Sequence, residues 1–458
     1  MKTTMSSTSL LVSAAAAFFV VAQIGIASSF NAVDAGVRPP GPVPSAGGAI
    51  TGLSSNQLEY FVAGQADFAE EESVTEGLGP RMNLDSCGGC HSQPAVGGSS
   101  PAVNPQIAFA TSNGGTDVPP SFLSANGPVR EARFVSNPDG TPDGGVHALF
   151  TINGRIGASG CSLSQPDFAR QVANHNVIFR IPTPVFGAGL IESIPDSAIL
   201  AAQASNAAAK ADLGIRGRAN FAVSGRTISG QTNNNGNDGT IARFGWKAQN
   251  KSLMLFSGEA YNVEMGITNE LFPTEREEKL ACQKAPVPND VTDADAATAV
   301  AAMSGVELFS HYMRTLAPPT PSQDTPGGAT SIAAGRTIFK SVGCAYCHTP
   351  SFTTGNAAIA ALANQPVNLF SDLLVHDMGV GLADGVSQGE AGPREFRSAP
   401  LWGLGERVFF LHDGRTSNLI TAIRAHASQG SEANGVVSNY LQLSETQKQN
   451  LLNFLRSL

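Results

Sequence analysis

The sequence is poor in charged residues and has no excess of positive charge. Charged side chains make up 14% of the 458 residues, where about 25% is usual for a soluble protein. The formal net charge is -9, so the chain lacks the basic footprint of a nucleic-acid-binding protein. We therefore expect no nucleic-acid partner, although an acidic face could steer a basic electron donor toward this chain.

The sequence also lacks the regular patterning of a helical bundle. Its 49 glycines and 28 prolines predict many turns and long surface loops. A length of 458 residues exceeds what one hydrophobic core usually serves, which favours two domains. We expect a mainly α fold with long irregular loops and a few short strands.

Long hydrophobic runs are absent apart from one, from Leu10 to Ile26. This run follows Lys2 and precedes the small residues Ala27-Ser28-Ser29, as in a secretory signal peptide covering residues 1–29. Export to the periplasm is the expectation. An uncleaved N-terminal membrane anchor is the alternative, because the run is nearly long enough to span a bilayer.

Cysteine is scarce, yet four of the six cysteines occur in two CxxCH elements. These are Cys87-Gly-Gly-Cys90-His91 and Cys344-Ala-Tyr-Cys347-His348. Two cysteines at this spacing form thioethers to one porphyrin, and the histidine that follows binds its iron. Neither copy has the second ligand pair of a zinc site or the βαβ context of a redox dithiol. The sequence therefore predicts two covalently bound c-type haems.

Two cysteines, Cys161 and Cys282, remain outside the CxxCH elements. In an oxidising compartment they are predicted to close a disulfide. Two separate buried thiols are the alternative.

Apolar spacing and capping signals predict several helices and a domain boundary. A Pro/Ser/Gly-rich linker at 318–329 separates an N-terminal haem domain (55–317, with an insertion) from a C-terminal one (330–458), and residues 30–54 form a second linker. Residues 111–160 are expected to form irregular loops and short strands, and 177–181 to form a strand. Helices are predicted at 58–68, at 197–211 with Asp196 as N-cap, at 294–316, at 332–341, and after the capping box Ser444–Gln447.

The two halves of the chain repeat one another beyond CxxCH. Thr183-Pro-Val-Phe-Gly-Ala-Gly-Leu echoes Ala399-Pro-Leu-Trp-Gly-Leu-Gly-Glu. Arg243-Phe-Gly-Trp-Lys-Ala followed by Ser252-Leu253 echoes Leu411-His-Asp-Gly-Arg-Thr followed by Asn418-Leu419. The same order in both halves indicates a duplicated, cytochrome c-like haem domain.

Several motifs occur between about residue 53 and the end of the chain, besides the two CxxCH elements. They are Gly77-Leu-Gly-Pro-Arg-Met-Asn, Gly97-Gly-Ser-Ser-Pro, Phe186-Gly-Ala-Gly-Leu-Ile-Glu-Ser-Ile-Pro, Arg243-Phe-Gly-Trp-Lys-Ala, Met265-Gly-Ile-Thr, Leu374-Val-His-Asp-Met-Gly, Leu401-Trp-Gly-Leu-Gly and Leu411-His-Asp-Gly-Arg. By these motifs the chain resembles the di-haem oxidoreductase family, relatives of bacterial di-haem cytochrome c peroxidases and of the di-haem enzyme that matures methylamine dehydrogenase. The resemblance implies peroxide reduction with electrons from a small periplasmic protein such as a c-type cytochrome. The alternatives are an oxidase or oxygenase of an organic or protein substrate, and a di-haem cytochrome that only transfers electrons.

The sixth coordination position of each iron separates an electron-transfer haem from a reactive one. His426 lies seven residues beyond Leu419, where the related peroxidases carry a methionine ligand, so the resemblance implies His348/His426 ligation of the second haem. Met378 and His412 are the rival ligands, and an exposed helix histidine is the ordinary alternative for His426.

The equivalent position in the first half is Ala260, which cannot bind iron. Nearby Glu264 resembles the acid/base glutamate of the related peroxidases, and it is the predicted catalytic residue. A plain surface glutamate is the alternative. His147 or His175 could instead cap the first iron, and Glu192 is a weaker carboxylate candidate.

Two further expectations concern the region between the haems. Trp246 or Trp402, which occupy repeat-equivalent motifs, could lie between the two haems, although either could also be a core anchor. Calcium at the domain interface stays open, and the Asn/Gly/Asp-rich segment 231–240, with Asp238 alone, lacks the ligands of a calcium loop.

Overall fold

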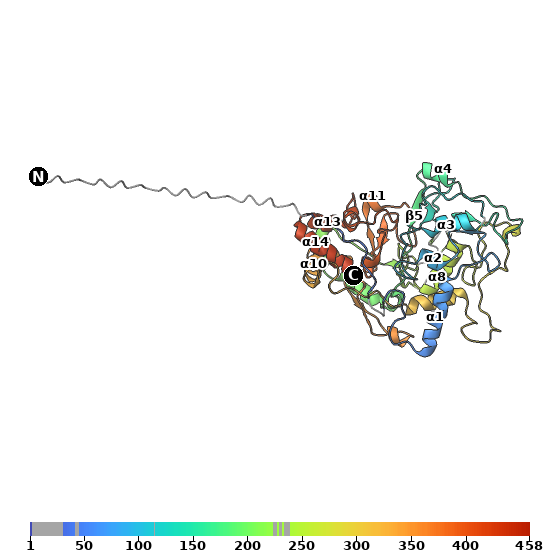
Figure 1. Ribbon diagram of the computed structural model, residues 1–458, viewed down its shortest axis with the longest axis horizontal. Helices are drawn as coiled ribbons and strands as arrows, with labels where there is room; N and C mark the ends of the chain where they lie inside the picture. The colour runs from blue at the N-terminus through green and yellow to red at the C-terminus, as the bar shows by residue number, and fades with distance from the viewer. Residues whose placement is uncertain (2–30, 42–44, 114, 223–226, 229–230, 233–238) are drawn as a thin grey trace. The chain divides into compact units, whose positions relative to one another are not determined.

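The computed structural model describes residue 1 and residues 31–41, 45–113, 115–222, 227–228, 231–232 and 239–458 (Figure 1). The chain divides into two units, Met1–Asn31 and Ala32–Leu458, and the fold described below is that of the second. Apart from Met1, the predicted signal peptide lies outside the described residues, as does Asp238. In the part of the chain that the structure describes, no helix is long and apolar enough to cross a membrane.

The fold is mainly helical with short strands. The helices are α1 (Ser55–Ala69), α2 (Cys87–Cys90), α3 (Pro105–Ser112), α4 (Phe168–Ala173), α5 (Ala188–Glu192), α6 (Asp196–Ala204), α7 (Ala207–Leu213), α8 (Leu253–Met265), α9 (Gly305–Thr315), α10 (Ala329–Ser341), α11 (Gly379–Leu382), α12 (Leu419–Ala425), α13 (Asn434–Leu441) and α14 (Glu445–Ser457), with 3₁₀ turns η1 (Leu280–Cys282), η2 (Cys344–Tyr346), η3 (Ala360–Leu362) and η4 (Leu404–Glu406).

The strands are short and pair antiparallel. A three-stranded sheet has the order β3-β2-β5, and the remaining pairs are β1-β4, β6-β9, β7-β8, β10-β11 and β12-β13. Their bounds are β1 (Arg81–Met82), β2 (Glu131–Phe134), β3 (Val146–His147), β4 (Phe150–Thr151), β5 (Val177–Arg180), β6 (Asn220–Phe221), β7 (Thr227–Ile228), β8 (Gln231–Thr232), β9 (Ile241–Ala242), β10 (Phe352–Thr353), β11 (Pro366–Val367), β12 (Val375–Asp377) and β13 (Glu395–Arg397).

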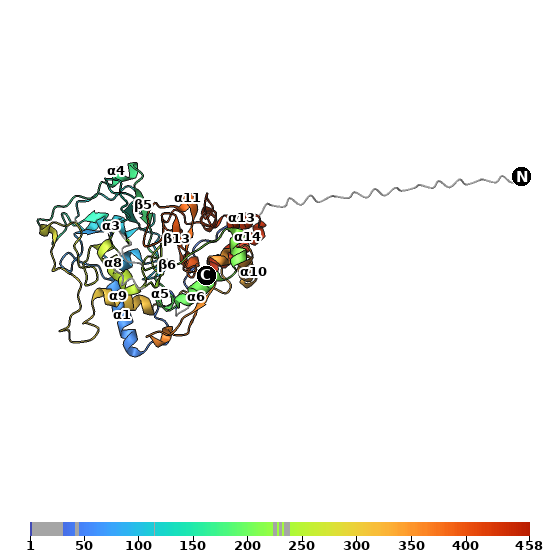
Figure 2. The ribbon, with the colours of Figure 1, turned by 180° about the vertical axis from the view of Figure 1, so that it is seen from behind.

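Each CxxCH element is framed by a pair of packed helices. In the first half α1 packs against α9, and in the second α10 packs against α14 (Figures 1 and 2). A glycine allows the close approach in both pairs, because a Cβ on Gly64 would meet the Leu308 carbonyl oxygen at 2.5 Å and one on Gly335 would meet that of Asn450 at 2.0 Å. The two halves thus also share a pair of packed helices, α1 with α9 and α10 with α14, although these helices are not part of the repeated sequence motifs.

Four residues beyond each of these glycines stands a buried phenylalanine that reaches the histidine of the nearby CxxCH. The rings of Phe68 and His91 are 6.0 Å apart, and those of Phe339 and His348 are 6.5 Å apart. The buried apolar residues accordingly gather in two main cores. One contains Phe68 and the other Phe339, and the first also includes residues of the second half such as Trp402.

The second repeated motif also folds alike in both halves. Phe244 forms an isolated bridge with Asn250, and Phe410 forms one with Thr416. A helix follows each bridge: Ser252 caps α8 and Asn418 caps α12 through their side chains. Equivalent positions of α8 and α12 can therefore be compared directly in the site.

Two helix predictions need correction. Segment 197–211 forms α6 and α7 with a break at Asn206, whose φ is 55°, and Asp196 does not cap it, because its carboxylate binds Arg243 and the Ile241 amide. The helix predicted at 294–316 begins only at Gly305, where Ser304 and Glu307 form a capping box. The helices predicted at 58–68, 332–341 and after Ser444, and the strand at 177–181, are confirmed.

The segment predicted as a linker at 30–54 is anchored to the second half. The Asp34 carboxylate pairs with Arg456 of α14 at 2.7 Å, and the Arg38 guanidinium pairs with Glu406 at 3.0 Å. The predicted disulfide between Cys161 and Cys282 is confirmed.

Candidate functional site

The first CxxCH forms one helical turn at the wall of a cavity. Ser86 caps this turn by accepting the Gly89 amide at 3.0 Å, and the His91 amide donates to the Cys87 carbonyl at 2.9 Å. Cys87, Cys90 and His91 all line the cavity, which we call the first cavity. The space between its walls, counted with its opening, is about 1150 Å³.

The ring of His91 is oriented by the loop that follows it. Its Nδ1 lies 3.0 Å from the carbonyl oxygen of Gly98. Burial lowers the pKa of His91 to about 4, against the opposing effect of the carbonyls of Gly98 and Thr183, so the ring is neutral. An Nδ1–H donated to Gly98 leaves Nε2 as the metal-binding nitrogen, which is the usual arrangement of a ligating histidine.

The second CxxCH repeats this arrangement in a second cavity of about 1560 Å³, again counted with its opening. The His348 Nδ1 lies 3.1 Å from the Phe370 carbonyl oxygen, and burial lowers the pKa of this ring to about 4. Burial also raises the pKa of the Cys344 thiol to about 12. Cys344, Cys347 and His348 line this cavity together with a mostly apolar wall.

His426, the predicted second ligand, faces the same cavity as His348. It follows α12, and its Nδ1 lies 2.8 Å from the Ala422 carbonyl oxygen. The two rings are close enough for the charge of His426 to lower the pKa of His348. His426 thus places Nδ1 against a backbone carbonyl, as His91 and His348 do, which leaves its Nε2 as the nitrogen that could bind a metal.

Other histidine and methionine side chains that line the second cavity are arranged differently. His376 has both ring nitrogens next to carboxylates, Nε2 at 3.0 Å from Asp372 and Nδ1 at 2.9 Å from Glu432. His412 stacks on Phe396 with 4.3 Å between ring centroids. Met378 and His412 both line the second cavity, so they remain the rivals that the sequence named.

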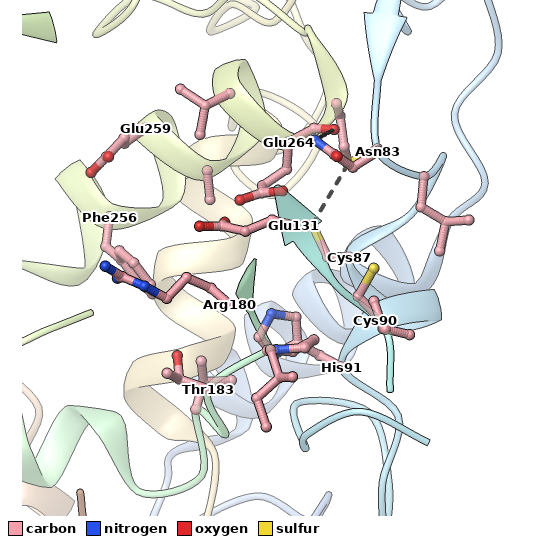
Figure 3. A pocket seen from close by; sticks show the side chains of 18 of the residues that line it. Asn83, Cys87, Cys90, His91, Glu131, Arg180, Thr183, Phe256, Glu259 and Glu264 are labelled. Atoms are coloured by element: carbon pink, nitrogen blue, oxygen red, sulfur yellow. Dashed lines mark hydrogen bonds between the residues drawn. The ribbon is translucent and has the colours of Figure 1, made fainter. Parts of the chain in front are cut away.

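The opposite wall of the first cavity belongs to α8. Ala260, the repeat equivalent of His426, lines the cavity there, and Glu264 lies one turn further along. Figure 3 shows the Glu264 carboxyl pointing toward that of Glu131, on the far side of the cavity from Cys90 and His91. The catalytic candidate therefore faces the first cavity and is not a surface glutamate.

Glu131 and Glu264 form a hydrogen-bonded pair of carboxyl groups. Burial and then the charge of Glu131 raise the pKa of Glu264 well above its ordinary value. Although burial opposes it, the guanidinium of Arg133 lowers the pKa of Glu131. One proton is therefore held on Glu264 while Glu131 is ionised.

Short strand β2 positions this pair. Glu131 and Arg133 are two residues apart and so point to the same side of the strand. Arg180 of the neighbouring strand β5 lies directly across from Glu131. The sequence interpretation missed Glu131 and Arg133, because a four-residue strand in a loop-rich segment carries no motif; the alternation Glu-Ala-Arg was the available signal.

The remaining candidates lie in other surroundings. His147 pairs with Asp143 at 2.8 Å and stacks on Phe134, and exposed His175 lies at the end of a short turn after α4; neither lines the first cavity. Glu192 binds Arg314 at 2.6 Å and accepts the Leu253 amide at 2.8 Å, so it supports the start of α8.

Of the two tryptophans, Trp246 lines both cavities. Its indole N–H donates to the Ile181 carbonyl at 2.9 Å. Trp402 instead packs on Gly187, where a Cβ would come within 2.7 Å of the ring, and it lines neither cavity. Trp246 is therefore the tryptophan that separates the two sites.

A sequence model of the family described as "Di-haem oxidoreductase, putative peroxidase" matches residues 135–458. No curated protein matches. A solved structure of hydrazine synthase from Kuenenia stuttgartiensis, pressurised with 20 bar of xenon, is similar at 18% identity over 35% of this chain and 56% of that chain, with a TM-score of 0.22. The family match begins after the first CxxCH and includes Glu264, the second CxxCH and His426.

Proposed function

Since the chain belongs to the di-haem oxidoreductase family, we propose that it is a periplasmic enzyme that reduces hydrogen peroxide with electrons from a small redox protein, such as a c-type cytochrome. Membership of the family implies two haem groups and oxidoreductase chemistry. Covalent attachment, the peroxide substrate, the electron donor and export are parts of the proposal.

The residues of both cavities fit a covalently held haem. Each cavity brings two cysteines and one histidine to its wall, and each histidine uses Nδ1 on a backbone carbonyl. Cys87 and Cys90 would hold one porphyrin, and Cys344 and Cys347 the other. When bound, the two haems supply electron transfer and the redox chemistry of peroxide cleavage.

The asymmetry of the two cavities carries the proposal. In the second cavity His426 faces the same space as His348, whereas in the first the equivalent residue is Ala260. A side chain that cannot bind metal leaves room for a small substrate opposite His91. The second site is thus suited to electron transfer and the first to peroxide.

The chain's own acid/base group stands at the first site. Peroxide cleavage requires a proton to move from one peroxide oxygen to the other. The raised pKa of Glu264 favours its protonated form, and the lowered pKa of Glu131 favours an ionised carboxylate beside it that can receive or return a proton. Arg133 keeps the pair at a single negative charge, so the protonated carboxyl stays available at the cavity wall.

The proposed electron route runs through Trp246. Its ring is the aromatic group shared by the walls of both cavities. We propose that the small redox protein delivers its electrons on the side of the second cavity.

The test begins with the haem content of the purified protein. Pyridine haemochrome titration should give two haems per chain for wild type and one for Cys344→Ala. The resting protein should contain one low-spin haem and one that binds cyanide. Peroxide should then be turned over with a reduced c-type cytochrome as donor.

Each failure has a distinct meaning. Two low-spin haems that bind neither cyanide nor carbon monoxide would identify an electron-transfer cytochrome. Ligand binding without peroxide turnover would favour the oxidase or oxygenase alternative. Two haems in Cys344→Ala would refute the covalent assignment.

A further inference from the structure

Two arginines line the second cavity, one at the end of β13 and one just after η4. Arg397 is the last residue of β13, and Arg407 follows η4; both line the cavity. Arg397 donates Nε to the Gly245 carbonyl at 3.0 Å, and Arg407 donates Nη2 to the Pro400 carbonyl at 2.8 Å. These bonds occupy only a fraction of the five N–H groups that each guanidinium carries.

Within the described residues, neither guanidinium forms an ion pair with a carboxylate. The Nε of Arg407 is buried and has no hydrogen-bond partner there. The nearest acid in sequence, Glu406, pairs its carboxylate with Arg38 at 3.0 Å. Its charge offsets only part of the effect of burial on Arg407, whose pKa stays lowered. Arg407 as a whole is only 9% exposed, so water has little access to its unpaired N–H groups, whereas Arg397 is half-buried.

The electrostatics of this arrangement call for an anion. Burial lowers the pKa of both side chains to about 10, and the charge of Arg407 further lowers the pKa of Arg397. A buried charge without a partner is destabilising, because it loses its hydration and gains no compensating interaction. A negative group that lies between or against the two guanidinium groups would therefore stabilise both.

We propose that Arg397 and Arg407 bind the two carboxylate groups of the porphyrin in the second cavity. This inference rests on the proposed function, since it requires a haem held by Cys344 and Cys347. The number of charges matches, because haem carries two propionate side chains and the cavity offers two guanidinium groups. The planar fork of arginine also matches a carboxylate in a way that lysine does not.

The consequence is a control on the reduction potential of the second haem. Positive groups at the porphyrin edge disfavour the ferric form, which carries one more positive charge than the ferrous form. Arg397→Met and Arg407→Met should each shift the reduction equilibrium about tenfold toward the ferric form, which corresponds to a potential about 59 mV lower. Arg336→Met, which removes an exposed arginine of α10, should leave the potential unchanged.

The experiment is a spectroelectrochemical titration of the holoprotein, with the low-spin haem followed separately. Unchanged potentials in both methionine variants, at two haems per chain, would overturn the inference and leave the proposed function standing. A wild-type protein without covalent haem would remove the proposed function itself. The two failures are therefore distinguishable.

Two further measurements decide between haem carboxylates and an exchangeable anion. Inorganic phosphate added at constant ionic strength should not change the wild-type potential; a dependence on phosphate would mean a free anion and would overturn the inference. If the methionine variants do not fold, Arg397→Lys and Arg407→Lys decide. Both should shift the propionate bending band in the resonance Raman spectrum, and an unshifted band in both refutes the assignment.

Discussion

Glu264 and Glu131 divide one proton between two carboxyl groups at the wall of the first cavity. Burial alone would raise the pKa of both, but Arg133 pairs directly with Glu131 and lowers its pKa, and Arg180 acts in the same direction. Arg133 also lowers the pKa of Glu264, but less than burial and the charge of Glu131 raise it. The neighbouring negative charge then raises the pKa of Glu264 further. The two guanidinium groups near Glu131 thus favour Glu264 as the acid of the pair.

Glu264→Gln tests this acid at the residue scale. Glutamine can still donate to Glu131 but cannot transfer a proton, so we expect both haem spectra to persist while peroxide turnover falls about 10²- to 10⁴-fold, the usual cost of losing a positioned acid/base. Steady-state peroxide reduction measures this loss. Glu59→Gln, at an exposed glutamate of α1, is the matched control. Full turnover in Glu264→Gln would exclude Glu264 as the acid.

His426→Ala tests the second ligand of the second iron. We expect the low-spin signal to be lost and that haem to bind cyanide, because alanine reproduces the situation of Ala260 in the first half. Met378→Leu should leave the low-spin signal intact. Optical and electron paramagnetic resonance spectra distinguish the two, and the reverse pattern would make Met378 the ligand.

At the scale of elements, a buried hydrogen bond joins the segment just after α1 to helix α8. The Tyr261 hydroxyl donates to the Glu72 carboxyl. Burial is the largest effect on this carboxyl and raises its pKa from 4.5 to about 7, and nearby Asp67 adds to the shift. The folded state therefore binds more protons than the unfolded state between these two pH values.

This proton uptake predicts a pH-dependent stability. Because the folded pKa of Glu72 is raised, its contribution is fully present below pH 4.5 and is lost as the pH rises to about 7. Glu72→Gln keeps the acceptor for Tyr261 and removes the titration, so its melting temperature relative to wild type should increase from pH 4 to pH 8. Glu76→Gln, at a carboxyl whose pKa is lowered, should not show this increase.

The disulfide between Cys161 and Cys282 joins a loop after β4 to the 3₁₀ turn η1. It closes a loop with a sequence separation of 121 residues. The chain-entropy relation gives about 5 kcal/mol as the upper limit for its contribution to the free energy of unfolding. A double change of both cysteines to alanine should lose up to this amount in denaturant titration. Two alkylated thiols in denatured, unreduced wild type would contradict the bond.

At the scale of the whole second unit, the two cavities meet at Trp246. Trp246→Phe should slow electron passage from the second haem to the first while leaving peroxide binding unchanged. Stopped-flow absorbance of the protein with its second haem prereduced measures this step. Trp402→Phe is the control, since Trp402 packs in the core against Gly187 and lines neither cavity. Equal effects of both substitutions would exclude a special role for Trp246.

The sequence by itself determined the local chemistry of this protein. A CxxCH element carries its cysteines and histidine within five residues, so their meeting needs no tertiary structure. The repeat identified Ala260 as the counterpart of His426, and the parity of the cysteines indicated the bond between Cys161 and Cys282. The family resemblance singled out Glu264. The domain boundary at 318–329 stays a prediction.

The tertiary structure alone decided what faces these groups. Glu131 meets Glu264 from a four-residue strand 133 positions earlier, and no local pattern encodes such a contact. Trp246 and Trp402 occupy equivalent motifs, but the fold places them differently. Trp402 packs against Gly187 in the core, whereas Trp246 lines both cavities. No sequence pattern singles out Arg397 and Arg407, and only the fold places both at the wall of the second cavity. Long-range packing sets these partners because burial and charge depend on neighbours in space, which the order of residues does not specify.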